Sequence, residues 1–168
     1  MAVFNKNTLT QVSGFDNQII AGELVYNQNT YWNLTLGNND NGDCNGIVTP
    51  LNLTGATITA QIIRRTLTNV KDSRYGLTFD IADVNPPPSP INLTITNISA
   101  LTGTFTLVID QATWNVIAGD PELDIQDINP VGFSGRIKIS FPASGSTPAN
   151  DMIIFLLFLI RSDAVVNN

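Results

Sequence analysis

Four carboxylates lie close together in the segment 119–127, where acid–base chemistry is the first possibility to consider: Asp120, Glu122, Asp124 and Asp127. Two carboxyl groups, one neutral and one ionised, catalyse glycoside hydrolysis when they face each other across a bound sugar. Closeness in sequence does not produce that opposed geometry, and no apolar pocket is identifiable around these residues. We therefore interpret the segment as a solvated acidic turn, with a docking patch for a basic partner as the alternative.

A second set of oxygen ligands occurs in the Asn/Asp/Gly-rich loop 37–46. The segment 41–46 has the opening spacing of a calcium loop, with oxygen ligands at alternate positions and then glycine. However, Asn52 stands where a bidentate glutamate is needed, and no helix is predicted beside the loop. Weak calcium binding through Asp40 and Asp43 is conceivable, but a hydrated turn is favoured. We therefore predict no metal site and no cofactor.

Two residue types that enzymes commonly use are scarce or missing. The chain has no histidine and one cysteine, Cys44. These counts exclude Ser-His-Asp and Cys-His nucleophile systems, histidine metal sites and an intramolecular disulfide. Cys44 lies in a polar loop without a basic neighbour in sequence, so nothing supports a reactive thiol. We expect a protein that is not an enzyme and has no catalytic residues.

The charge balance limits the class of partner. Eight Lys and Arg oppose 14 Asp and Glu, which gives a net charge of −6. Charged residues make up 13% of the 168 residues, about half the usual share, and Asn and Thr take their place. Arg64, Arg65 and Arg74 are too few to neutralise phosphates, so no nucleic-acid partner is expected.

The periodicity of the apolar residues predicts strands rather than helices. Alternation with β-branched residues and intervening turn-formers predicts seven or eight strands, near residues 19–22, 31–36, 56–62, 77–81, 91–95, 105–109, 136–141 and 151–161. One short helix is predicted over 110–117, with Asp110 as the N-cap and Gly119 as the stop. This pattern favours an all-β fold, an antiparallel immunoglobulin-like β-sandwich. Residues 31–168 are expected to form its single domain, and residues 1–30 an N-terminal arm or edge segment.

The run 152–160 is the most hydrophobic part of the chain. Its nine residues are too few to span a bilayer as a helix, and no signal peptide is recognisable at the N-terminus, so no membrane association is expected. As a strand it is apolar on both faces, whereas a sandwich strand normally has one solvent face. The second face must be covered by the N-terminal arm, by a loop or by another subunit. We predict a subunit interface, with the protein itself as one partner, at Ile153, Phe155, Leu157 and Leu159.

Three aromatic residues raise an alternative function, a carbohydrate- or receptor-binding β-sandwich module whose exposed rings stack on a ligand. Trp114 and Tyr31 are the candidates for a stacking platform, whereas Trp32 shares its phase with Leu34 and Leu36 and is predicted to lie in the core.

From residue 31 onward, four segments resemble a family of small β-sandwich domains in tailed-bacteriophage virions, the N-terminal domain of upper-baseplate and tail-fibre proteins. They are 31–36, the turn and strand 53–64, the strand 103–109 followed by Thr113, and a closing hairpin formed by 133–141 with 152–166. Gly55 suits the turn because glycine tolerates positive φ. The resemblance implies a virion structural protein that binds other virion proteins, as a capsid decoration, neck, tail or baseplate component, and it implies no catalytic residues.

Overall fold

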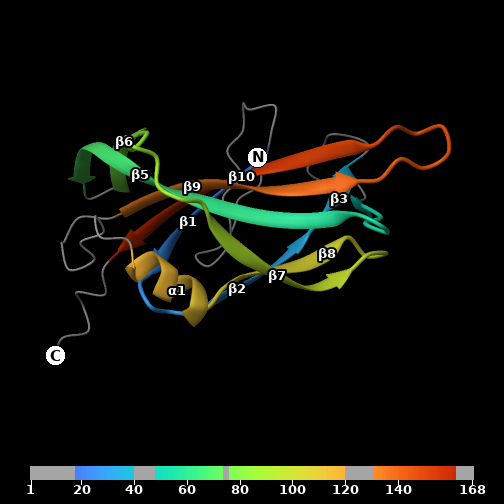
Figure 1. Cartoon of the computed structure of the whole chain (residues 1–168), viewed down its shortest axis with the longest axis horizontal. Helices are drawn as coiled ribbons and strands as arrows, with labels where there is room; N and C mark the ends of the chain where they lie inside the picture. The colour runs from blue at the N-terminus through green and yellow to red at the C-terminus, as the bar shows by residue number, and fades with distance from the viewer. Residues whose placement is uncertain (1–17, 40–47, 74–75, 120–130, 162–168) are drawn as a thin grey trace.

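The computed structural model describes residues 18–39, 48–73, 76–119 and 131–161. These residues form mostly strands and one short helix, as expected, in the order β1 (Gln18–Val25), β2 (Thr30–Thr35), β3 (Gly37–Asn39), β4 (Val48–Pro50), β5 (Thr57–Ser73), β6 (Gly76–Ala82), β7 (Ile91–Ser99), β8 (Thr104–Ile109), α1 (Gln111–Ala118), β9 (Val131–Phe141) and β10 (Asn150–Arg161) (Figure 1). The helix has the predicted boundaries, because Asp110 caps it and Gly119 follows its last residue.

One sheet of eight strands contains most of the chain. Its order is β1-β10-β9-β5-β7-β8-β2, with β6 paired to the far part of β5, while β3 and β4 form a separate ribbon. The sheet is mixed rather than antiparallel, because β1 runs parallel to β10. This corrects the expectation of a purely antiparallel sheet: β1 comes from the segment 1–30 and occupies the edge beside the last strand, a long-range pairing that sequence periodicity does not reveal.

Strand β7 carries the sheet from one layer into the other. Residues 91–93 pair with β5, and residues from Thr94 onward pair with β8. The sheet thus curls over in a barrel-like way, with β5, β9 and β10 on one side and β2, β7 and β8 on the other (Figure 1). Trp32 on β2 packs against Phe158 on β10, with ring centroids 5.1 Å apart, and so connects the two layers.

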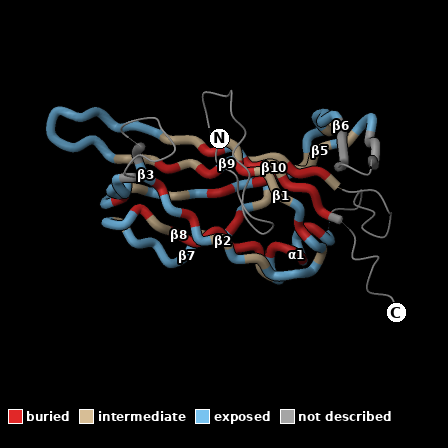
Figure 2. Tube along the Cα trace, turned by 180° about the vertical axis from the view of Figure 1, so that it is seen from behind, coloured by how far each residue is buried: buried red, intermediate tan, exposed pale blue. Residues whose placement is uncertain are grey.

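The core lies between these layers and follows the predicted alternation. On β5, Ala60 and Ile62 are buried while Gln61 between them is exposed, and on β9, Ile137 and Ile139 are buried. Figure 2 shows these buried stretches along the strands and the exposed connection between β9 and β10. Each fully buried isoleucine side chain of this kind stabilises the fold by about 1.5–3 kcal/mol.

Strand β8 departs from the predicted alternation. All residues from Phe105 to Ile109 are buried, including Thr106 and Val108 on the outer phase. β8 lies between β2 and β7 in the sheet, and side chains from both of these strands contact Thr106. Thr106 satisfies its hydroxyl by donating to Asn33 Oδ1 at 2.7 Å and accepting from Asn97 Nδ2 at 3.3 Å.

Candidate functional site

The outer side of β10 carries the residues predicted to form a subunit interface. Ile154, Leu156 and Phe158 point into the core, so the alternate residues point away from it. Phe155 is 42% exposed, whereas Leu159 is buried and the remaining two are half-buried. We call this set the β10 outer face: Ile153, Phe155, Leu157 and Leu159.

The neighbouring strands extend and border the β10 outer face. In register with Phe155 lie Ile19 on β1 and Arg136 on β9, and paired residues share one side of the sheet. Leu157 pairs in the same way with Ala21 and Ser134. The result is an apolar stripe over β1 and β10 with basic side chains on the β9 side, an arrangement typical of an interface core beside its polar rim.

An ion pair marks one end of this stripe. Lys138 Nζ lies 2.8 Å from Asp151 Oδ2, and both side chains are substantially exposed. Hydrogen bonds from Lys138 and then Ser140 lower the pKa of the Asp151 carboxyl below its ordinary value. Because water screens an exposed ion pair, the pair contributes little to stability. Its main effect is to hold the two charged side chains in place at the rim of the apolar stripe.

The structure separates the two residues predicted to stack on a ligand. Trp114 on α1 is fully buried, with its ring edge-on to Tyr26 at a centroid distance of 5.6 Å. It offers no ring face to a ligand, which corrects that prediction. The physical reason is that Trp114 lies on the buried side of α1, together with Thr113 and Ile117. Tyr31 on β2 is 61% exposed and stays a candidate.

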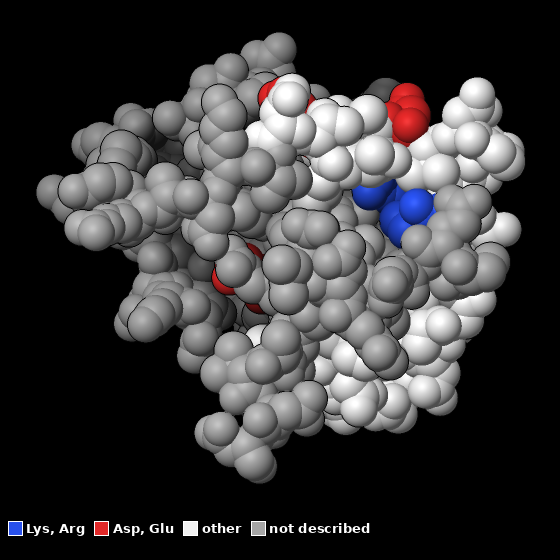
Figure 3. Space-filling view, turned by 90° about the vertical axis from the view of Figure 1, so that its left-hand side faces the viewer, with Lys and Arg blue, Asp and Glu red and all other residues white. Residues whose placement is uncertain are grey.

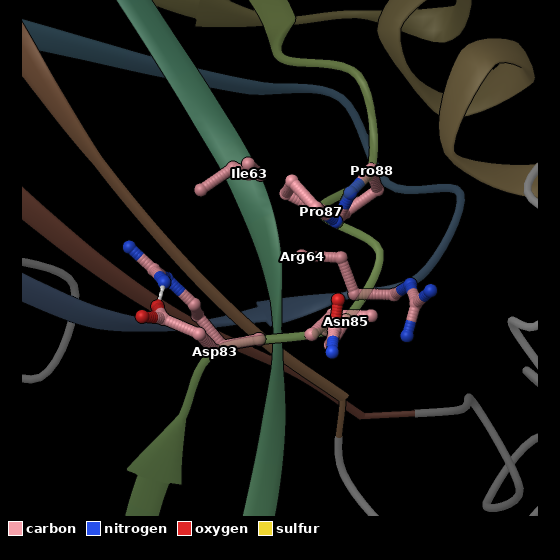
Figure 4. Close-up of a pocket in the computed structure, with 8 residues that line it drawn as sticks. Ile63, Arg64, Asp83, Asn85, Pro87 and Pro88 are labelled. Carbon is pink, nitrogen blue, oxygen red and sulfur yellow. Dashed lines mark ion pairs between the residues drawn. The ribbon is translucent and has the colours of Figure 1, made fainter.

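A pocket of about 350 Å³ lies beside the middle of β5, and the sequence pattern did not predict it. Its labelled lining residues come from β5 and from the proline-rich segment after β6 (Figure 4): Ile63, Arg64, Asp83, Asn85, Pro87 and Pro88. Pro86, Pro87 and Pro88 follow one another in this segment, and proline rings restrict the backbone and make it stiff. The position of this segment beside Arg64 depends on the pairing of β5 with β6, which a local sequence pattern does not predict.

Two of the charged side chains that line this pocket form an ion pair with each other. Arg65 forms an ion pair with Asp83, marked by the dashed line in Figure 4, and its Nε donates to Ser134 Oγ. Figure 3 shows this end of the molecule, where basic and acidic groups lie beside each other on a surface that is otherwise uncharged or not described. The Arg65 guanidinium therefore serves first to hold the segment after β6 against the sheet.

The Asn/Asp/Gly-rich loop 37–46 and the acidic segment 119–127 lie mostly outside the described residues. Asp40, Asp43 and Cys44 belong to 40–47, and the four clustered carboxylates belong to 120–130. Across the ranges that the structure does describe, no three His, Cys, Asp or Glu side chains gather closely enough to hold a metal ion. Over the same ranges, no helix has the length and apolar character to span a membrane.

Comparison with known proteins adds no identification. No family model matches the chain, and no curated protein matches it significantly.

Proposed function

We propose that this chain is a non-enzymatic structural subunit of a tailed-bacteriophage virion that assembles with copies of itself and with other virion proteins. The observation that carries the proposal is the β10 outer face, where a strand with a complete core face presents a second row of large apolar side chains. Phe155 is 42% exposed on that row. A partly exposed apolar stripe favours association, so covering it by another subunit is the direct physical use of this surface.

The segments that resemble the virion domains support the proposal by the elements they form. The turn after Leu53 is closed by a hydrogen bond of 3.0 Å from the Ala56 amide to the Leu53 carbonyl, with Gly55 at φ 77°. The segment 103–109 contains β8, which leads directly into α1, and β9 pairs antiparallel with β10 as the closing hairpin. We further propose that the two layers joined by β7 form an immunoglobulin-like sandwich with a parallel edge strand.

The interface part of the proposal is tested by the molar mass of the full chain in solution. We expect an oligomer by light scattering and a monomer for Phe155→Asp, because a buried carboxylate opposes association. The matched control is Leu101→Asp, which places the same charge on an exposed apolar residue of the turn before β8. A monomeric wild-type chain, or an oligomer unchanged in Phe155→Asp, would contradict self-assembly through this face.

The virion part is tested separately by looking for the protein in purified phage particles. Mass spectrometry of the particles should recover its peptides in stoichiometric amounts, and labelling with a specific antibody should place it on the head, neck, tail or baseplate. Particles that are complete without the chain would overturn this assignment.

A further inference from the structure

The two layers of the fold differ in the charge of their outer faces. Strands β2, β7 and β8 contain no Asp, Glu, Lys or Arg. The opposite layer carries Arg136, Lys138 and Asp151 among its outward residues. A solvent-facing sheet surface without charge, in a chain of net charge −6, is a specific feature that the proposed subunit interface does not use.

The register identifies the side chains that make up this surface. Tyr31, Val108 and Thr94 form one row across the three strands, and Asn33, Thr106 and Thr96 form the next. Because these pairs share one side of the sheet, their side chains form a continuous patch. We call it the neutral face: Tyr31, Asn33, Thr94, Thr96, Asn97 and Thr106.

Tyr31 gives this face an aromatic platform. Its side chain is 61% exposed, and its cross-strand partner Val108 is buried beneath the surface. The ring is therefore held beside a packed strand while much of it stays in contact with solvent. An exposed aromatic ring with a hydroxyl at its edge suits a ligand that has both apolar C–H groups and polar groups.

A hydrogen-bonded chain fixes the polar groups beside the ring. Asn97 Nδ2 donates to Thr106 Oγ1 at 3.3 Å, and Thr106 donates to Asn33 Oδ1 at 2.7 Å. The second bond orients the Asn33 amide, because its oxygen faces Thr106 and its NH2 group is the end that can donate to a ligand. Groups held in this way lose little conformational entropy when a ligand binds.

We propose that the neutral face binds an uncharged oligosaccharide, with one sugar ring stacked on Tyr31 and sugar hydroxyls hydrogen-bonded to Asn33, Thr94 and Thr96. Sugar hydroxyls both donate and accept, and amide and hydroxyl side chains meet both needs without a charge. The residues of this face offer no cation to an anionic ligand, and Tyr31 is the exposed aromatic ring among them, a small apolar area for a protein contact. This inference does not rest on the β10 outer face, which belongs to the other layer.

The test is binding of the full chain to immobilised hexasaccharides of glucose, mannose, galactose and N-acetylglucosamine, with a hexamer of galacturonic acid as the charged comparison. We expect saturable binding to at least one neutral sugar, with an affinity that does not change between low and high salt because no ion pair contributes. If no neutral sugar binds saturably, or if only the acidic one binds and salt releases it, the proposal fails.

Variants locate the binding on the neutral face. Tyr31→Ala should weaken the affinity about tenfold, which corresponds to about 1.4 kcal/mol, whereas Tyr31→Phe keeps the ring and should stay within about twofold. Asn33→Ala should also weaken binding, and Val116→Ala on the exposed side of α1 is the matched control with no effect. Because Tyr31 is exposed, its variants should keep the thermal midpoint of unfolding. Sugar binding that survives Tyr31→Ala, or a Tyr31→Ala variant that changes molar mass instead of sugar affinity, would contradict the proposal.

Discussion

The indole Nε1 of Trp114 donates a hydrogen bond of 2.9 Å to the backbone carbonyl oxygen of Gln28. These residues are 86 positions apart, and the bond joins α1 to the turn between β1 and β2. The same ring is fully buried and contacts Tyr26 edge-on, just before that turn. Trp114 thus connects the helix to the segment between the two edge strands β1 and β2, which explains why a tryptophan occupies this position.

Replacing Trp114 should therefore reduce stability and not sugar binding. We expect Trp114→Phe to lower the free energy of unfolding by about 1–3 kcal/mol, because the bond to Gln28 is lost and the smaller ring leaves space in the core. Urea denaturation followed by circular dichroism measures the change. Tyr31→Phe is the control, since it alters an exposed ring, and an equally small effect of both changes would contradict the structural role of Trp114.

The N-cap of α1 gives a second prediction. Asp110 Oδ1 accepts from the backbone amide and the hydroxyl of Thr113, at 3.0 and 3.1 Å. Asp110→Ala should cost about 1 kcal/mol of unfolding free energy, whereas Asp110→Asn should cost little at neutral pH because asparagine caps equally well. Denaturation of both variants at pH 7 tests this, and equal losses would show that charge rather than capping geometry matters.

Acid should destabilise the fold partly through two carboxyl groups. The Thr113 amide lowers the pKa of Asp110, and the Lys138 hydrogen bond lowers that of Asp151, both from an ordinary value of 3.8. Since the unfolded chain binds these protons at higher pH than the folded chain, their contribution is present above about pH 4 and is lost as the pH falls through the folded-state values. Unfolding free energies at pH 7 and pH 3 should therefore differ less in Asp110→Asn than in the wild-type chain. An unchanged difference would contradict the pKa assignment.

Two glycines at positive φ allow the cost of backbone strain to be measured apart from the cost of steric crowding. Gly103 has φ 63° and Gly145 has φ 59°. A Cβ on Gly103 would lie 2.6 Å from the Leu36 carbonyl oxygen and 2.7 Å from that of Leu51, whereas a Cβ on Gly145 would meet nothing within 4 Å. Gly145→Ala should cost about 1–2 kcal/mol through strain alone. Gly103→Ala should cost clearly more by thermal or urea unfolding, and equal losses would show that the turn at Gly103 relaxes freely.

Local sequence signals predicted those parts of the fold that depend on neighbouring residues. Alternation placed Leu34 and Ile62 in the core, and the residue types at Asp110 and Gly119 predicted both ends of α1. These local signals could not predict which strands pair when they are far apart in the sequence. The parallel alignment of β1 with β10 depends on which edge is free after the rest of the sheet has formed, and the burial of Thr106 depends on the strands that flank β8.

For the candidate sites too, local sequence signals predicted some features, whereas long-range strand pairing determined the others. The two-sided apolar pattern of 152–160 predicted the β10 outer face from one strand alone. The neutral face needed three strands, because Asn33, Thr96 and Thr106 come together only through the register of β2, β7 and β8. Trp114 was misassigned because an aromatic residue on a short helix has no periodicity to show which side it faces.

The two proposed faces should act independently, since they lie on opposite layers and share no residue. Phe155→Asp should abolish self-association and leave the affinity for the neutral sugar unchanged, and Tyr31→Ala should do the reverse. Because distant changes without shared partners are additive, the double variant should show both losses at their single-variant size. Light scattering and sugar-binding measurements on the wild-type chain, the two single variants and the double variant test this additivity. Because an oligomer binds an immobilised sugar with added avidity, the comparison uses the affinity per site for a soluble hexasaccharide. If Phe155→Asp weakened that affinity, the sugar would have to contact the assembled interface, and the separation of the two faces would be wrong.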